Sequence, residues 1–446
     1  MNYDAAVRYL LTLGRELAAP TQAAAKFDLE NITVLAKRLG HPERAFPSAH
    51  IAGTNGKGST AAFLESILRR AGFRTGLNTS PHLERINERI RVNGEEISDA
   101  AFAETMTRIQ SVTEELLAAG KLRAHPTYFE CVTAMAFEYF SRAEVNFGVF
   151  EVGLGGRLDA TNILTPAVSI ITRIDFDHEN FLGHSLWEIA SEKAGIMKPG
   201  VPVVIGEQHE EAREVILERA RELGCPIIEI GAEYRIENLE MEEGCARARV
   251  TRIASGRSME IAPRLPGGFQ LQNALTAVAA AGVLQRQGFH ISADAIREGI
   301  AATVWPGRLE KLYSRPDVYL DGAHNPGAAR ELAGFWEQRF ANRKIFLVYG
   351  ALRDKAVDEI AGILFPHAAE VIFTEPRTSR AISAASLAEI AAHYASRSVV
   401  MADAEQALDY ALGKAEADDA VFITGSLYLV GQLRHCWKQR MQVAAG

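Results

Sequence analysis

The stretch His50-Ile-Ala-Gly-Thr-Asn-Gly-Lys-Gly-Ser-Thr60 contains three glycines and a lysine, and it separates a short apolar run from a segment with helical periodicity. Glycines at these positions allow successive backbone N–H groups to turn toward one anion. The helix expected over 61–70 directs the positive end of its dipole to the same place. The stretch therefore predicts a phosphate loop between a strand and a helix.

Two side chains of this loop suit a nucleotide. Lys57 supplies a mobile positive charge for terminal phosphates, and Ser59 is placed to reach a magnesium ion. The stretch departs from the strict pattern G-x-x-x-x-G-K-[ST], because Ile51 stands at the first glycine position and Gly58 separates Lys57 from Ser59. The alternative is a purely structural glycine-rich turn, but the flanking strand and helix favour the phosphate loop.

Beyond the loop, short β-branched runs alternate with segments of helical length, which is typical of βαβ units and a mostly parallel sheet. We expect an α/β fold with an N-terminal phosphate-loop ATPase domain over 1–300, a linker over 301–309 and a smaller doubly wound C-terminal domain over 310–446. An irregular piece at 234–261 predicts an appended β excursion. The expected strands are 145–151, 167–172, 201–205, 318–321, 345–349, 370–373, 398–401 and 420–424.

The overall composition excludes some classes of protein. The 446 residues carry a net charge of −8, which disfavours a general affinity for nucleic acid. The longest mostly apolar stretch, 274–284, is far shorter than the roughly 20 residues that span a bilayer, so we expect no membrane-embedded segment. The four cysteines are scattered without metal-ligand spacing, and the first residues lack a signal-peptide pattern. We therefore expect a cytoplasmic protein with reduced thiols.

Further polar groups follow two of the expected strands. Glu151 ends one strand before a glycine cluster, whose spacing fails the dinucleotide pattern because Leu158 stands at its sixth position. Asp175, Asp177 and His178 end the next strand, and carboxylates with a neutral imidazole suit magnesium. Taken singly, Glu151 could be an ion-paired glutamate and His178 a structural histidine.

Other candidates carry weaker signals. Lys193 lies on an expected helix, where a surface salt bridge is its ordinary role. Asp321 begins the turn Asp-Gly-Ala-His-Asn-Pro between a strand and a helix, which is a ligand-facing position in an open α/β sheet. A solvated surface role is nevertheless the default for Asn273, Arg308 and Asp321 when each is taken alone.

Eight ordered motifs together resemble the folylpolyglutamate synthase and dihydrofolate synthase family. That family belongs to the muramyl-peptide ligase superfamily of ATP-dependent amide-forming enzymes. The resemblance runs from about residue 26 to Leu429. The motifs are HIAGTNGKGST (50–60), TSPHL (79–83), TYFE (127–130), EVGLGGRLDATN (151–162), DFDH (175–178), EKAGI (192–196), WPGRLE (305–310) and DGAHNP (321–326).

The resemblance implies a role for each matching residue. Those that would bind ATP are Thr54, Asn55, Gly56, Lys57, Gly58, Ser59, Asn273, Arg308 and Asp321. Those that would hold two magnesium ions are Ser80, Glu151 and His178, with Ser59 as a further candidate. Those that would line the folate or pteroate site are Phe27, Asp28, Thr127, Tyr128, Phe129, Glu130, Leu158, Asp159 and Ala160. His324 and Ser426 would contact glutamate, and the catalytic residues would be Lys57, His178 and Lys193, the last matching a lysine that is often carboxylated in the family.

The implied activity is ATP-dependent ligation of L-glutamate to a folate carboxylate through an acyl phosphate. The resemblance implies a tetrahydrofolylpolyglutamate synthase that also acts as a dihydrofolate synthase on dihydropteroate, and a monomer. A muramyl-peptide ligase is the main alternative, and the TSPHL and WPGRLE motifs favour the folate branch. A phosphate-loop ATPase switch is a second alternative, which leaves the TYFE and LDATN segments without a role.

Overall fold

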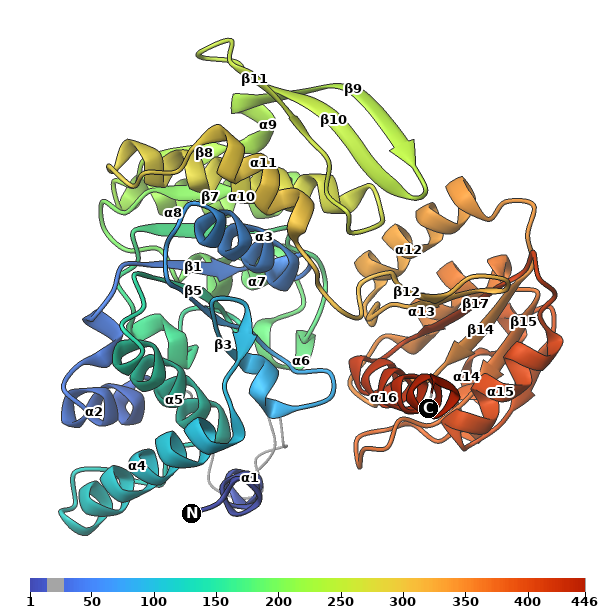
Figure 1. Ribbon diagram of the computed structural model, residues 1–446, viewed down its shortest axis with the longest axis horizontal. Coiled ribbons are helices and arrows are strands. Elements are labelled where there is room, and N and C mark those ends of the chain that lie inside the picture. The colour runs from blue at the N-terminus through green and yellow to red at the C-terminus, as the bar shows by residue number, and fades with distance from the viewer. Residues whose placement is uncertain (14–27, 446) are drawn as a thin grey trace.

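The computed structural model describes residues 1–13 and 28–445 (Figure 1). Phe27, expected in the folate site, lies outside the described residues. The first large sheet has the strand order β4-β3-β2-β5-β1-β6-β7-β8. The strands β2, β5, β1, β6, β7 and β8 run parallel, and β3 and β4 are antiparallel at one edge. Its strands are β1 (Ser48–Ala52), β2 (Thr75–Asn78), β3 (Ile90–Val92), β4 (Glu95–Glu96), β5 (Phe147–Glu151), β6 (Val168–Ile171), β7 (Val203–Ile205) and β8 (Ile227–Glu229).

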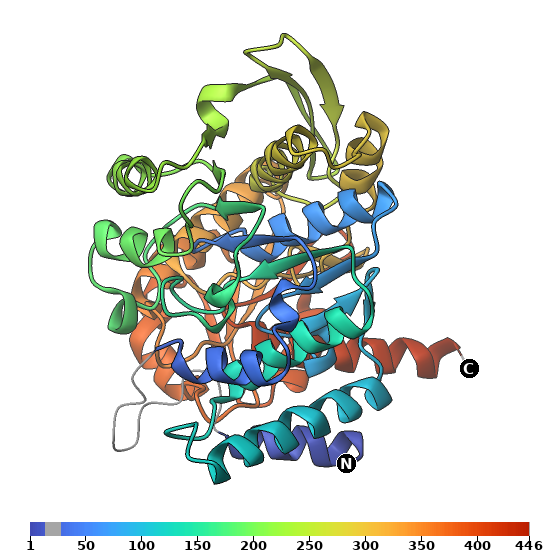
Figure 2. The same cartoon turned by 90° about the vertical axis from the view of Figure 1, so that its left-hand side faces the viewer.

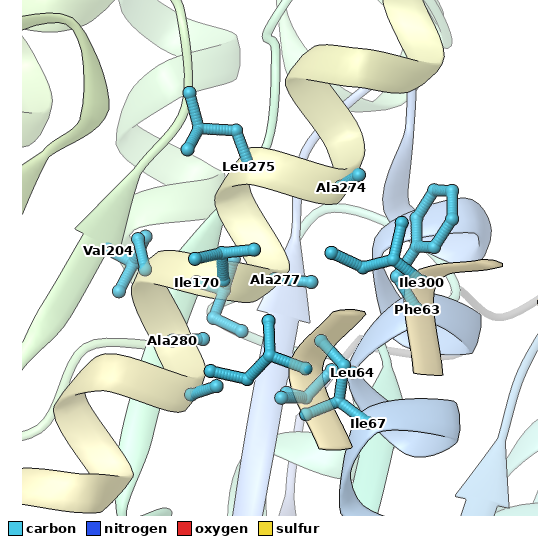
Figure 3. Close-up of a cluster of buried hydrophobic side chains, with 14 of the residues drawn as sticks. Phe63, Leu64, Ile67, Ile170, Val204, Ala274, Leu275, Ala277, Ala280 and Ile300 are labelled. Carbon is cyan, nitrogen blue, oxygen red and sulfur yellow. The ribbon is translucent and has the colours of Figure 1, made fainter. Parts of the chain in front are cut away.

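Helices cover both faces of this sheet, so its central strands are buried along their whole length. On one face, α3 (Lys57–Arg70), α10 (Phe269–Arg286) and α11 (Ala293–Ala302) pack against the strands (Figure 3). On the other lie α1 (Tyr3–Thr12), α2 (Glu30–Arg38), α4 (Asp99–Ala118) and α5 (Tyr128–Arg142). The helices α6 (Glu179–Leu182), α7 (Leu186–Ala194) and α8 (Glu210–Glu222) follow β6 and β7.

A small antiparallel sheet has the order β11-β10-β9, as the irregular piece at 234–261 predicts. It follows the short helix α9 (Ile230–Glu233) and consists of β9 (Tyr234–Glu242), β10 (Cys245–Arg252) and β11 (Ser258–Ile261). Alternate residues of β10 are buried against α10, because side chains alternate between the faces of a strand. In both overall views this sheet lies at the opposite end of the molecule from α1 and α4 (Figures 1 and 2).

The second large sheet has the order β12-β13-β17-β14-β15-β16, with β12 as its antiparallel edge strand. Its strands are β12 (Glu310–Tyr313), β13 (Asp317–Leu320), β14 (Ile345–Tyr349), β15 (Glu370–Phe373), β16 (Ser398–Val400) and β17 (Ala420–Thr424). One face packs on α12 (Pro326–Arg339), α13 (Val357–Leu364) and α14 (Ala384–Ala391), and the other on α15 (Ala404–Lys414) and α16 (Leu427–Ala445). The expected α/β class is confirmed, with a parallel-rich first sheet and a separate doubly wound second sheet.

We refer to residues up to Ala302 as the N-terminal part and to residues from Glu310 as the C-terminal part. The helix α11 continues to Ala302, so two residues of the expected linker 301–309 belong to it. It ends there because the next residue, Thr303, has an extended backbone with a ψ of 128°. The helix expected over 61–70 is α3, which begins at Lys57 because Gly56 caps it with a left-handed φ of 85°. Among residues 1–13 and 28–445, no helix has both the length and the apolar character needed to cross a bilayer.

Two helical glycines allow a matched test of the packing between α11 and α3. A Cβ at Gly299 would lie 2.5 Å from the Cα of Ile67, so Gly299→Ala must displace backbone. A Cβ at Gly334 meets no described atom within 4 Å, so Gly334→Ala removes only the entropic cost of glycine. We expect G299A to lower the free energy of unfolding by about 1–3 kcal/mol and G334A to raise it by up to about 1 kcal/mol. Equal thermal unfolding midpoints for the two variants would contradict this packing.

Candidate active site between the two sheets

The carboxyl ends of β1, β5 and β6 and the turn after β13 surround a cavity of about 220 Å³. Loops meet there because the carboxyl ends of parallel strands lie at the same edge of a sheet. The expected site residues that line the cavity are Thr54, Asn55, Gly56, Lys57, Gly58, Ser59, Ser80, Glu151, His178, Lys193, Asn273, Arg308, Asp321 and His324. Those outside its lining, within the part of the chain that the structure describes, are Asp28, Thr127, Tyr128, Phe129, Glu130, Leu158, Asp159, Ala160 and Ser426.

The phosphate loop is held so tightly that two of its residues must be glycine. Gly53 has a φ of 150°, and a Cβ there would lie 1.9 Å from the Thr172 Oγ1. A Cβ at Gly56 would lie 2.2 Å from the Asn273 Oδ1. The Lys57 Nζ donates hydrogen bonds to the carbonyl oxygens of Gly53 and Thr54, at 2.9 and 3.1 Å. Burial lowers the pKa of Lys57, although the charges of neighbouring carboxylates oppose this shift.

Lys193 is a buried residue in contact with this loop rather than a surface salt-bridge residue. Its side chain comes from α7, and its Nζ donates to the Gly53 carbonyl oxygen at 2.9 Å. Burial, with a further contribution from the charge of Lys57, lowers the pKa of Lys193 to about 7. The Lys193 amine is therefore uncharged in a substantial fraction of molecules near neutral pH. The uncharged amine is the form that reacts with carbon dioxide. The surface interpretation of Lys193 is wrong.

Glu151 and His178 offer the donor atoms that a hard divalent cation uses. The Glu151 Oε2 accepts a hydrogen bond from the Ser80 backbone N–H at 3.1 Å, and burial raises the pKa of Glu151 against the pull of Lys57. Burial lowers the pKa of His178 to about 3, so its imidazole is neutral. The buried His178 Nδ1 has no hydrogen-bond partner among the described residues. This donor set fits Mg²⁺, although the described residues bring together no three His, Cys, Asp or Glu side chains able to hold a metal alone.

The segment between the two sheets is tied to the turn after β13 by Asp321. Its two carboxylate oxygens accept hydrogen bonds from the backbone N–H groups of Leu309 and Ala323, each at 2.9 Å. The Arg308 guanidinium lines the cavity and donates to the Gly307 carbonyl oxygen at 3.1 Å. Asp321 is only 6% exposed, so the solvated interpretation of this residue is wrong.

The TYFE (127–130) and LDATN (158–162) segments contact the loop after β5 and hold it in place. The Thr127 and Glu130 side chains form a capping box at the start of α5. The Phe129 ring leaves no room for a Cβ at Gly153, which would lie 2.4 Å from its Cζ. The Asp159 Oδ2 accepts hydrogen bonds from the backbone N–H groups of Gly153 and Leu154, at 2.9 and 3.0 Å. These contacts show a structural role, and the expected folate contacts of these segments remain predictions.

Asp177, one of the two carboxylates that the sequence offered for magnesium, lines the cavity. The structure adds two residues that we did not single out from the sequence, Asn325 and Lys355. Asn325 lies in the DGAHNP motif and adjoins the cavity through its hydrogen bond to Asn55. Lys355 forms an ion pair with Asp177, and the Lys355 Nζ lies 2.7 Å from the Asp177 Oδ1. Lys355 lies in the loop after β14. The only feature of the sequence that could have indicated a site residue there is its position after a strand of a parallel sheet.

The fold is that of a Mur ligase. The pattern of the Mur ligase middle domain matches residues 51–281, and that of the Mur ligase glutamate ligase domain matches residues 307–427. A dihydrofolate synthase/folylpolyglutamate synthase of Bacillus subtilis is 38% identical over 407 residues, which cover 90% of this chain and 92% of that protein.

Solved structures agree with this assignment. The folylpolyglutamate synthase of Mycobacterium tuberculosis, complexed with ADP and AMPPCP, has a TM-score of 0.88 at 31% identity and covers 98% of this chain and 99% of its own. Escherichia coli FolC in complex with DHPP and ADP has a TM-score of 0.86 at 31% identity and covers 99% of each chain. This chain therefore belongs to the folylpolyglutamate synthase/dihydrofolate synthase family, as its motifs predict.

Asp159→Asn tests whether this carboxylate holds the loop after β5. An amide keeps the size of the side chain but offers one acceptor oxygen, so it cannot serve both Thr161 and the Gly153–Leu154 amides. We expect the D159N change to reduce hydrogen-exchange protection of residues 152–155 by about 1–3 kcal/mol. Asp294→Asn, which removes a carboxylate from the surface ion pair with Arg297, is the control. Unchanged protection in D159N would contradict the assigned role.

Proposed function

We propose that this chain ligates L-glutamate to a folate carboxylate at the expense of ATP. The reaction forms an amide, ADP and phosphate. The same chemistry underlies both proposed activities, tetrahydrofolylpolyglutamate synthase and dihydrofolate synthase. The observation that carries the proposal is the cavity, where the phosphate loop, Glu151, His178, Lys193 and Arg308 meet between the two parts. The names of the Bacillus subtilis relative and of the Mycobacterium tuberculosis structure support this activity.

The phosphate loop would hold the triphosphate of ATP. The backbone N–H groups at the start of α3 are available to an anion there, and Lys57 lies among them. A Lys57 ammonium that turned from the Gly53 and Thr54 carbonyl oxygens to a phosphate would exchange neutral acceptors for a charged one. Asn273, Arg308 and Asp321 would contact the rest of the nucleotide from the other walls of the cavity.

Ser80, Glu151 and His178, with Ser59 beside the phosphates, would hold two Mg²⁺ ions. Bound there, Mg²⁺ would neutralise charge on the transferred phosphoryl group. The neutral state of His178 suits this role, because a protonated imidazole has no lone pair to offer. Burial raises the pKa of the Glu151 carboxyl, and a cation bound beside it would lower that pKa and favour the carboxylate.

A carboxylate is a poor acyl donor, because its charge repels an amine and it has no usable leaving group. Transfer of a phosphoryl group from ATP converts the folate carboxylate into an acyl phosphate, from which the glutamate amine displaces phosphate. The two parts would exclude water from this intermediate. His324 would contact glutamate at the cavity, and Ser426, which is 1% exposed, would act beside the lining residue Leu427. The folate would lie toward Asp28, 127–130 and 158–160.

The proposal includes a cytoplasmic location and a monomer that works on these small molecules alone. The four cysteines support the location, since each is a free thiol in the described chain.

An assay of ADP release tests the activity directly. Dihydropteroate and tetrahydrofolate are offered separately, each with and without glutamate, and amide formation is followed by mass spectrometry. With either dihydropteroate or tetrahydrofolate, we expect ADP release only when glutamate is present. The rate of ADP release should then equal the rate of amide formation. Lys57→Ala should lower this rate by about 10²–10³-fold, because the phosphoryl group loses its mobile cation.

The matched control is Lys121→Ala, which removes an exposed lysine and should leave the rate unchanged. ADP release that needs neither folate nor glutamate would favour an ATPase switch, and ligation of a muramyl peptide would favour a cell-wall enzyme. A K57A variant with full turnover would contradict the role of the phosphate loop.

Lys193 should carry a carbamate. With the pKa of Lys193 lowered to about 7, its amine is neutral in about one molecule in ten at about pH 6 and in about nine in ten at about pH 8. We therefore expect ¹³C-bicarbonate to give a protein-bound carbamate signal in carbon NMR that grows over this range. Lys193→Arg is the control, because a guanidinium stays protonated. An identical spectrum for K193R and the unchanged protein would contradict the modification.

A further inference from the structure

The Asp177 carboxylate is a junction between the two parts of the molecule. It lies after β6 in the N-terminal part, and its side chain is 10% exposed. Three groups of the C-terminal part approach it: the Lys355 Nζ at 2.7 Å from Oδ1, the Asn325 Nδ2 at 3.4 Å from Oδ2, and the His324 Nε2 at 3.6 Å from Oδ2. These groups come from two different turns, after β13 and after β14.

The same carboxylate contacts the neighbouring His178. The His178 backbone N–H donates to the Asp177 Oδ1 at 2.9 Å, and the His178 Nε2 lies 3.6 Å from Oδ2. His178 has a φ of 54°, which costs free energy in a residue with a side chain and persists only where the surroundings hold it. Asp177 therefore connects the C-terminal part to both the backbone and the ring of His178.

Lys355 is buried, and Asp177 is its nearest carboxylate. The Lys355 side chain is 6% exposed, and its other acidic neighbour, Asp354, is 3.9 Å away and already pairs with Arg380 at 2.7 Å. A buried ammonium is stable only when it is paired. Next to this pair, Asn55 of the phosphate loop and Asn325 exchange amide hydrogen bonds of 2.9 and 3.2 Å. The contacts that join the two parts at this side of the cavity are thus polar.

We infer that Lys355 is a positioning residue whose ion pair with Asp177 couples the docking of the C-terminal part to the orientation of His178. The inference rests on the proposed ligase function and assigns a further residue to it. The acyl phosphate then forms only where the two parts are docked, so water has little access to it. Loss of the pair should slow ligation and also divert ATP into hydrolysis.

Lys355→Met tests this coupling in the full-length protein. We expect kcat to fall by about 10²-fold, since small displacements of reacting groups have effects of this size. We also expect the ratio of phosphate released to amide formed to rise above that of the unchanged protein, and Lys355→Arg to restore the ratio. Lys311→Met is the matched control, because the Lys311 Nζ also lies 2.7 Å from a carboxylate oxygen, that of Asp317, but within the C-terminal part.

Two further measurements separate the possible outcomes. Hydrogen exchange of residues 176–182 should increase in K355M and not in K311M, and this readout needs no activity. If the unchanged protein fails to ligate, the proposed function is wrong, and exchange still decides the coupling. If K355M folds poorly, the double variant D177N/K355M removes both buried charges and should show the same raised ratio. A K355M protein with a lower melting temperature but unchanged kcat, ratio and exchange would overturn the inference.

Discussion

The carbonyl oxygen of Gly53 accepts hydrogen bonds from two lysine side chains, Lys57 and Lys193, and the site is arranged around this shared acceptor. The two lysines come from helices on opposite sides of the loop, α3 and α7, so the carbonyl group joins both helices to the end of β1. Their proximity also contributes to the lowered pKa of Lys193, because each ammonium disfavours the charge of the other. Only glycine fits at position 53, since a Cβ would overlap with Thr172.

This arrangement explains how an acidic protein offers a place for polyanionic ligands. The chain carries a net charge of −8, yet Lys57 and Arg308 line one cavity together with the amino end of α3. Buried carboxylates at Glu151 and Asp177 lie among these cations and offset part of their mutual repulsion. The potential at the site is thus set by a few groups at short range, where the low dielectric strengthens each interaction, rather than by the net charge.

Much of the fold could be predicted from the sequence, since strands such as 345–349 and 420–424 agree with the structure residue for residue. The phosphate loop could also be placed, because glycine spacing and flanking periodicity are local. Asp159 and Glu130 were harder to interpret, because a motif shows which residues recur but not whether they touch a ligand or hold a loop. The surface roles expected for Lys193 and Asp321 are wrong because both side chains are buried. The sequence at each position does not show which elements pack over it.

The sequence by itself determined the elements, the position of the anion-binding loop and the family, because periodicity, glycine conformation and motif order act over short stretches of chain. Only the tertiary structure decided which distant charges meet. Asp177 and Lys355 are 178 positions apart, and neither predicts the other. They pair because the carboxyl ends of strands in two separate sheets face one another, and this depends on how the sheets pack rather than on any local pattern.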